Sequence, residues 1–454
     1  MICFLSTVNS LVEMEITTDD PNIDRGRAWI VLVSSFFGMF IFAAFMHGNG
    51  VFTAAILEHL TTDISKASWV GSTQLIMMHV PGPLCGIITS QLGCGRTTFL
   101  AGIIILGGMI GAYFSTSITG LTLTAGAIAG FGIGLILNTS NTIVGHYFIK
   151  RRALASAIVM SGSGIGILVT GPMVQFLTDK YGVEGAYLIQ GAFGFNACVL
   201  GYLMKPSAIE RNKSNRNMNA SKSIVQNLKK YRDIATNVSY VSYLMSFGCL
   251  YVAENIAIVH LANYVLYKGS TIYQAASLFT AKGFGSLSGR LLMGVVASDP
   301  RIKPEILHTS IMGVLGSIFT VFPVYSDNYE PQLIFALACG LYTGALDSLI
   351  TPISVHYTGV TNLAYCYGLL ALLVGISALI GPPLAATLVK SGLSYDICFI
   401  LGGGAFWLGC CLGLGMMMTK PKNNNEDMER RRDKKTSTRS GTDTICTRNS
   451  RQCQ

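Results

Sequence analysis

The sequence predicts an all-α membrane protein with twelve transmembrane helices, and three observations lead to this fold class. Half of the 454 residues are hydrophobic and only 12% are charged, whereas a soluble domain carries about 25% charged residues. Apolar segments recur along the chain, and roughly 20 such residues are enough to cross a bilayer. The chain also holds 50 glycines, and small residues let membrane helices approach one another closely.

The apolar segments form two sets of six, which predicts two six-helix halves related by pseudo-symmetry. The first set occupies residues 28–53, 66–90, 97–118, 120–145, 153–178 and 184–204, and the second occupies 237–266, 272–297, 305–326, 331–356, 362–389 and 394–419. Between the sets, the Lys, Asn and Ser content predicts a flexible linker rather than a domain. The expected organisation is an N-terminal segment (1–27), a first bundle (28–204), a basic linker (205–236), a second bundle (237–419) and a basic, disordered tail (420–454).

Positive charge is concentrated in the linker and the tail. Residues 205–233 hold eight Lys and Arg against two acids, and residues 420–454 hold ten against five. Because cytoplasmic segments of membrane proteins are enriched in Lys and Arg, we expect a multi-pass protein of the plasma membrane with its N- and C-termini in the cytoplasm. The net charge of +9 therefore reflects topology in a lipid bilayer, and no nucleic-acid partner is expected.

The sequence gives no sign of enzymatic chemistry. The 12 cysteines lie mostly in apolar segments, and neither a CxxC pair nor a His/Cys/acid spacing typical of a metal site occurs. There is also no nucleophile–base set and no nucleotide-binding motif. We therefore expect neither an enzyme nor a bound metal or other cofactor.

The most specific local pattern lies between the fourth and fifth apolar segments. The run HYFIKRRALA (146–155) is followed by SGSGIG (161–166). Its cations, Lys150, Arg151 and Arg152, predict a cytoplasmic loop that they anchor at the membrane surface. Further matches occur at 24–29, 68–75, 82–84, 137–152 and 381–385, and at 392 and 395. Together these patterns closely resemble the monocarboxylate transporter family (solute carrier family 16-like) of the major facilitator superfamily.

The resemblance implies the major facilitator fold, in which the substrate site lies between the two halves near the bilayer midplane. It also implies a secondary transporter that moves small monocarboxylates or related organic anions across the plasma membrane by alternating access. Protons are a coupling partner for some family members, and a single-span chaperone subunit is a partner for others. One loop departs from the superfamily pattern, because residues 90–96 lack the usual acid and carry a displaced arginine at Arg96.

Ionisable residues inside the predicted spans are the candidates for a mechanism, because a charge inside a membrane costs roughly 2.5–3.5 kcal/mol on insertion scales. Arg290 lies 18 positions after residue 272, and Asp347 lies 16 positions after residue 331. With a rise of about 1.5 Å per residue, the two lie at similar depths. The same comparison places Lys282 near Glu254 at a second level. We therefore expect two pairs of opposite charge.

Arg290 is the strongest candidate for substrate binding. The resemblance implies that an arginine at this position of the eighth helix holds the substrate carboxylate. A guanidinium stays charged and offers a planar fork that matches two carboxylate oxygens. The alternative is a purely structural salt bridge to Asp347, which is also compatible with substrate binding if Asp347 compensates the arginine when no substrate is present.

Two residues depart from the proton relay of the proton-coupled family members. Ser286 stands where those members have an aspartate, and His47 stands where they have a lysine. His47 titrates near neutral pH when unperturbed, so His47, Glu254 and Asp347 are the candidates for proton coupling or gating. The Lys282–Glu254 pair is equally compatible with a gate and with a structural role. We list Arg290, Asp347, His47 and Ser286 as candidate substrate-binding residues.

Two further functions remain open at this point. Members without the full relay include facilitative carriers of aromatic amino acids, so a carrier of these or of another carboxylate-bearing substrate is one alternative. A non-transporting receptor or scaffold with a carrier fold is the other. Arg290 separates the classes, because a carboxylate carrier needs it and a receptor does not.

Overall fold

The computed structural model describes residues 23–60, 62–211 and 224–418, and every regular element within these ranges is a helix. This agrees with the predicted all-α class. The predicted tail (420–454), most of the predicted N-terminal segment (1–27) and the centre of the predicted linker lie outside the described residues.

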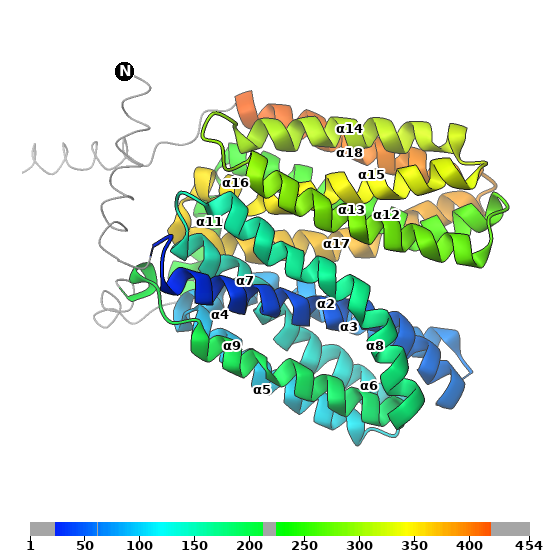
Figure 1. The fold of residues 1–454 in the computed structure, drawn as a ribbon, viewed down its shortest axis with the longest axis horizontal. Helices are drawn as coiled ribbons and strands as arrows, with labels where there is room; N and C mark the ends of the chain where they lie inside the picture. Colours follow the sequence, from blue (N-terminus) through cyan, green and yellow to red (C-terminus); the bar gives the residue numbers. More distant parts are fainter. Residues whose placement is uncertain (1–22, 61, 212–223, 419–454) are drawn as a thin grey trace, which may run out of the picture. The chain divides into compact units, whose positions relative to one another are not determined.

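The first half of the chain forms one group of packed helices, coloured blue to green in Figure 1. It contains α2 (Arg27–His59), α3 (Ile64–His79), α4 (Gly82–Leu92), α5 (Cys94–Tyr113), α6 (Ile118–Leu121), a π-helical segment (Thr122–Ile128), α7 (Ala129–Tyr147), α8 (Arg152–Phe195) and α9 (Ala197–Leu203). The backbone of α8 leaves the helical conformation at Gly182, where φ is 70°. This positive φ favours glycine, and it divides α8 into two apolar parts.

The second half forms a second group, coloured green to orange. It contains α12 (Val238–Tyr267), α13 (Ile272–Val296), α14 (Pro304–Tyr325), α15 (Tyr329–Ser348), α16 (Ile350–Thr358), a 3₁₀ turn (Val360–Asn362), α17 (Leu363–Lys390) and α18 (Ile397–Met418). We call the two groups the N-half and the C-half.

Nine helical stretches within the described residues are long and apolar enough to cross a membrane, and α3 with α4, bent by 48°, forms a tenth. One of the nine, Arg152–Leu203, is 52 residues long and breaks at Gly182, so it accounts for two of the predicted segments. The 25-residue α13 carries Lys282 and Arg290 and is not among the nine. With these two additions, each of the twelve predicted segments corresponds to helix.

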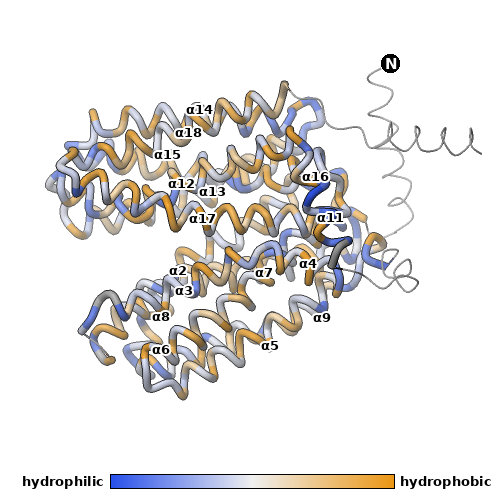
Figure 2. Tube along the Cα trace, turned by 180° about the vertical axis from the view of Figure 1, so that it is seen from behind, coloured by the Kyte–Doolittle hydropathy of each residue, from blue (hydrophilic) through white to orange (hydrophobic). Residues whose placement is uncertain are grey.

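The surface has the character expected of a protein in lipid. Large apolar side chains are exposed along the helices, for example Phe284 and Leu292, which are 62% and 60% exposed. Hydrophilic residues gather instead at the two ends of the helices (Figure 2). Exposed apolar area of this extent is unfavourable in water and is expected where helices face a bilayer.

The linker contains a helix that the sequence analysis did not expect. α11 (Ile224–Ala235) lies between the two halves in the chain, and its buried side chains Asn227 and Ile234 recur at helical spacing with the partly buried Tyr231. The Tyr231 hydroxyl donates to Pro83 O (2.6 Å), and Asn227 Oδ1 accepts from the Tyr365 hydroxyl (2.9 Å). The Lys and Asn content suggested flexibility, but one apolar face is enough to dock this segment.

The hydrogen bonds that we find between the two halves, within the described residues, lie near one end. We call the end that carries α11 the linker end and the opposite end the far end. Three hydrogen bonds cross between the halves near the linker end, and they join Ser90 to Tyr365 (2.8 Å), Asn138 to Ala364 O (3.0 Å) and Ser156 to Thr351 (2.7 Å).

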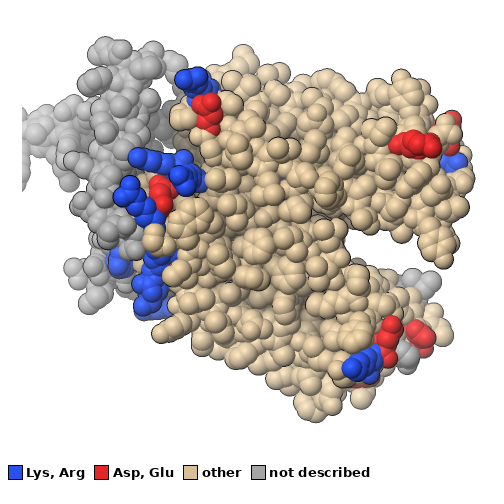
Figure 3. Space-filling view, in the orientation of Figure 1, with Lys and Arg blue, Asp and Glu red and all other residues tan. Residues whose placement is uncertain are grey.

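Two glycines make the closest approach at the linker end. A side chain on Gly82 of α4 would collide with the backbone oxygen of Gly368 in α17, so the two helices are in backbone contact there. At the far end the surface is instead hollowed between the halves (Figure 3). The molecule is therefore closed at the linker end and open at the far end.

Candidate substrate-binding site

A cavity of about 260 Å³ lies between the two halves. Most of its wall is apolar, and side chains of α2, α7, α12, α13, α15 and α17 contribute to it. Its charged and imidazole-bearing lining residues are Arg290, Asp347, Glu254, Lys282, His47 and His79. A mostly apolar pocket with a few convergent polar groups is typical of a site for a small molecule.

Arg290 of α13 forms an ion pair with Asp347 of α15. Arg290 Nη2 lies 2.8 Å from Asp347 Oδ2, and the two side chains are 8% and 15% exposed. They meet because α13 and α15 pack very closely, with Gly289 against the backbone of Leu341 and Gly344 against the backbone of Ser286. Small residues at a helix contact allow this approach. The pair is the one expected from the depths of the two residues in the sequence.

The guanidinium of Arg290 is only partly satisfied by this pair. Its Nε and Nη1 atoms are buried and have no hydrogen-bond partner among the described residues. Nη1 lies where the glycine motif of α8 leaves space, because a Cβ on Gly164 would stand 3.1 Å from it. An unsatisfied buried donor costs about 1–3 kcal/mol, and more for a charged group. Nε and Nη1 donate from different edges of the guanidinium, so the arrangement favours an anion that accepts from one of them.

Tyr251 of α12 holds the other oxygen of Asp347. Its hydroxyl donates to Asp347 Oδ1 at 3.1 Å, and Tyr251 also lines the cavity. This tyrosine was not among the residues predicted to form the site. Its spacing was the available signal, because Tyr251 and Glu254 are three positions apart and so share a helix face.

The second pair joins α13 to α12. Lys282 Nζ lies 2.8 Å from Glu254 Oε1, and the two side chains are 13% and 14% exposed. The Cys339 thiol of α15 lies 3.9 Å from Glu254 Oε2. This pair was also expected from the sequence, and it places all four charged residues of the cavity wall in the C-half.

The N-half contributes uncharged polar groups. His47 of α2 lines the cavity and is exposed. His79 of α3 is buried, has its Nδ1 2.9 Å from Leu75 O, and packs edge-on against Phe42, which fits a structural histidine. Ser286, the remaining predicted site residue, is buried in α13 one turn before Arg290 and also lines the cavity.

The cationic loop lies away from the cavity, at the linker end. The carboxylate of Asp24 accepts from the backbone N–H groups of Ile149 (3.3 Å), Lys150 (3.0 Å) and Arg151 (3.3 Å). The Lys150 and Arg151 side chains are exposed, and Arg152 Nε donates to Phe148 O. Asp24 therefore fastens this loop to the start of α2, a contact that the sequence analysis did not identify.

Comparison with known proteins shows the superfamily of this chain. The Major Facilitator Superfamily model matches residues 28–329. Monocarboxylate transporter 2 of Rattus norvegicus is 26% identical over 430 residues, which cover 90% of this chain and 88% of that protein. Monocarboxylate transporter 3 of Gallus gallus is 27% identical and covers 88% of this chain and 82% of its own length.

A solved structure shares the arrangement of helices. The crystal structure of the E. coli fucose:proton symporter FucP superposes with a TM-score of 0.66 over 84% of this chain and 97% of that chain, at 12% identity. At this identity the likeness shows the fold alone. The superfamily model covers most of the chain, and the curated relatives that match nearly its full length are named as monocarboxylate transporters. The chain therefore belongs to the major facilitator superfamily and, within it, is similar over most of its length to monocarboxylate transporters.

Proposed function

We propose that this protein is a secondary transporter that carries small monocarboxylates through a cavity opened alternately at its two ends. One observation carries the proposal: Arg290 is buried in the cavity wall with two guanidinium nitrogens that have no hydrogen-bond partner among the described residues. A substrate carboxylate that accepts from Nη1 would satisfy one of them and place its charge against the guanidinium. Asp347 offsets the charge of Arg290 when no substrate is present, because an unpaired buried charge is costly.

The cavity favours an acid with an apolar body over an amino acid. Asp347 is engaged by Arg290 and Tyr251, and Glu254 is engaged by Lys282. An α-amino group would need a carboxylate of its own, and both carboxylates of the wall already have partners. The alternative of a carrier for aromatic amino acids is therefore less well supported, although the apolar wall itself would accept an aromatic ring.

The charge balance of the cavity supports linkage to a proton. Two cations (Arg290 and Lys282) and two carboxylates (Asp347 and Glu254) line it, so the charged wall is neutral as a set. A bound monocarboxylate adds one negative charge in a medium of low dielectric, which is costly. A proton taken up with the substrate, at His47, Asp347 or Glu254, would cancel that charge.

The same proposal places the linker end in the cytoplasm of a plasma-membrane protein. The exposed cations of the 150–151 loop and the Lys and Arg in the described part of the linker gather at this end, as expected for cytoplasmic segments. Epitope tags before residue 28 and after residue 418 should then be inaccessible to antibody in intact cells. Dependence of surface delivery on a single-span chaperone subunit stays a prediction, and co-expression of such a subunit would test it.

Uptake by purified protein in liposomes tests the proposal directly. Labelled lactate, pyruvate, a ketone body, tyrosine and an iodothyronine should be compared at about pH 6 and about pH 7.5, on either side of the unperturbed histidine pKa. Arg290→Ala is the test variant. Arg301→Ala is the matched control, because Arg301 is an exposed arginine between α13 and α14.

We expect uptake of at least one monocarboxylate that Arg290→Ala abolishes and Arg301→Ala leaves intact. An inward proton gradient should accelerate it, and a potassium diffusion potential should not, because an anion and a proton together are electroneutral. Equal uptake by wild type and Arg290→Ala would remove Arg290 from the mechanism. Binding of a carboxylate without any flux would support the receptor alternative instead.

A further inference from the structure

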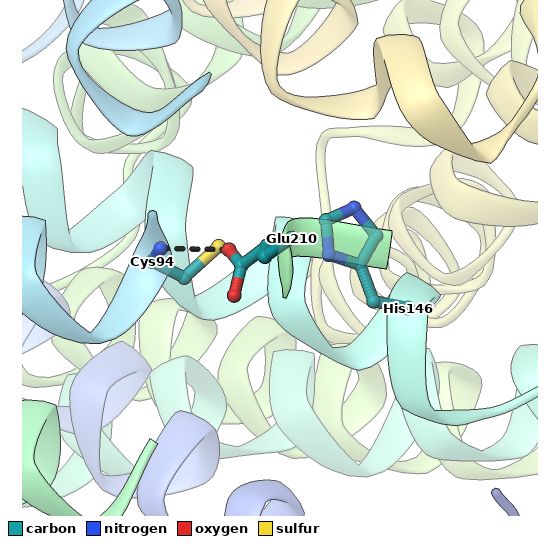
Figure 4. A group of neighbouring side chains, drawn as sticks. All are labelled: Cys94, His146 and Glu210. Carbon is teal, nitrogen blue, oxygen red and sulfur yellow. Dashed lines mark hydrogen bonds between the residues drawn. The ribbon is translucent and has the colours of Figure 1, made fainter. Parts of the chain in front are cut away.

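A second cavity, of about 620 Å³, lies at the linker end. It shares no lining residue with the central cavity, and the function proposed above does not involve it. Its wall includes the start of α5, the end of α7 and the segment that follows α9. One side chain from each of these three places converges there: Cys94, His146 and Glu210 (Figure 4). A ligand atom of each lies within 4.8 Å of the other two.

The three side chains carry ligand types that zinc prefers. Zn²⁺ is bound by cysteine thiolate, histidine imidazole and carboxylate oxygen, whereas Mg²⁺ and Ca²⁺ prefer sites made of oxygen alone. A tetrahedral ion with bonds of about 2.0–2.3 Å holds its ligands about 3.5 Å apart. The three groups would therefore need to close by roughly 1 Å, a shift that side-chain rotation supplies.

Surrounding groups already orient the side chains. Glu210 Oε1 accepts from the backbone N–H of Cys94 at 2.8 Å, and Glu210 Oε2 accepts from the backbone N–H of Ser207 at 3.2 Å. Ser207 Oγ lies 3.4 Å from His146 Nδ1. Each carboxylate oxygen has a second lone pair for an ion, and outer hydrogen bonds of this kind are what hold metal ligands in place.

The cavity gives an ion a way in. Cys94 and His146 are buried, and Glu210 is partly buried, but all three line the cavity, which leaves room for water as a fourth ligand. Three cations, Arg96, Lys205 and Arg211, also line it, and all three are exposed at the surface, where long side chains keep their charges in solvent. Thiolate and carboxylate together bring two negative charges, which match a divalent ion.

We propose that Cys94, His146 and Glu210 form a binding site for a transition-metal ion with the ligand preferences of Zn²⁺. The ion would tie α5, α7 and the segment after α9 together beside the closed end of the molecule. Sequence spacing gave no indication of this site, because 52 positions separate Cys94 from His146 and 64 separate His146 from Glu210. Only the packing of the N-half brings the three together.

Cadmium is a suitable probe, because Cd²⁺ bound to thiolate absorbs in the ultraviolet. The full chain should be purified in detergent without a polyhistidine tag and titrated with Cd²⁺, then with competing Zn²⁺. Cys94→Ser, His146→Gln and Glu210→Gln are the test variants. Cys85→Ser is the matched control, because Cys85 is a buried cysteine of the neighbouring α4 that lies outside the cluster.

We expect a thiolate absorption band that Zn²⁺ displaces, and a rise in thermal stability with Zn²⁺, in wild type and Cys85→Ser. Cys94→Ser should lose the band, and the other two variants should lose more than about tenfold in affinity, since even an outer-shell change costs about 10–100-fold. A band of equal strength in Cys94→Ser would assign the metal to other cysteines and overturn the proposal. If Cys94→Ser fails to fold, Glu210→Gln is the decisive variant, because it keeps a side-chain acceptor. Stabilisation by Zn²⁺ that survives in Glu210→Gln would overturn the proposal as well.

Discussion

The two halves of the molecule face one cavity with different chemistry. The C-half supplies all four of its charged lining residues, arranged as two ion pairs, whereas the N-half supplies His47, His79 and a largely apolar surface. A substrate anion would therefore be held by one half and covered by the other. Under the proposed function, binding and closure would belong to separate halves, so changes on the two sides should have different effects.

The largest effect is expected where the C-half would meet the carboxylate. Arg290→Lys keeps the positive charge and the pair with Asp347 but replaces the planar fork by a single point. Losing one charged hydrogen bond costs about 1.5–3 kcal/mol, so the apparent affinity for substrate should fall about 10- to 100-fold. Uptake measured over a range of substrate concentrations would give this affinity. An unchanged affinity would mean that a positive charge is sufficient without the planar fork.

The second ion pair should behave as a structural unit of the C-half. Breaking a buried pair costs about 3–5 kcal/mol, because one charge is left uncompensated, whereas removal of both partners is often neutral. Lys282→Met and Glu254→Gln should each lower thermal stability, and the double variant should recover most of the loss. If the double variant folds well but transports nothing, the pair is a gate rather than a support.

A smaller effect is expected on the N-half. His47→Gln removes an imidazole that lines the cavity and leaves the ion pairs of the opposite wall in place. We expect less than about a tenfold loss of uptake at pH 7.5, which is smaller than the roughly 10²–10⁴-fold loss that removal of a proton-transferring group causes. Loss of the acceleration at pH 6 in this variant alone would sharpen the comparison, because the N-half would then handle the proton and the C-half the anion.

The smallest effect is expected at the far end of the C-half, outside the cavity. Asp396 accepts from Tyr264 and Ser394 (2.7 Å each) and lies 3.6 Å from Lys268. Burial by itself would raise the pKa of Asp396, but these hydrogen bonds and the charge of Lys268 together lower it. A carboxyl group whose pKa is lower in the folded state than in the unfolded state stabilises the fold at pH values above the unfolded pKa, which is near 4. This stabilisation is lost as the pH falls through the folded pKa.

Asp396→Asn should therefore lower the melting temperature slightly at pH 7, and the difference from wild type should disappear below about pH 4. The effect should be small because the group is partly exposed. Thermal unfolding in detergent at several pH values would measure it. A difference that persists in acid would show that the contribution comes from the shape of the turn and not from the charge.

The sequence predicted the helices and both ion pairs because each depends on local patterns. The segment 305–326 corresponds to α14 at Pro304–Tyr325, and the depths of Arg290 and Asp347 follow from counting along straight helices. α11 was missed because its apolar face is short and is set among Lys and Asn residues. Tyr251 and Asp24 were missed because their roles depend on partners that are distant in the sequence, which only three-dimensional packing brings within reach.

The backbone contact between Gly82 and Gly368 affects how quickly an empty carrier resets. A seal made of side chains must freeze rotamers each time it shuts, at about 0.5–2 kcal/mol for a long residue, whereas two glycines lose no such freedom. Resetting without cargo limits net flux but not the exchange of one acid for another. A methyl group added by Gly82→Ala would wedge the seal, so we expect net uptake to suffer more than exchange.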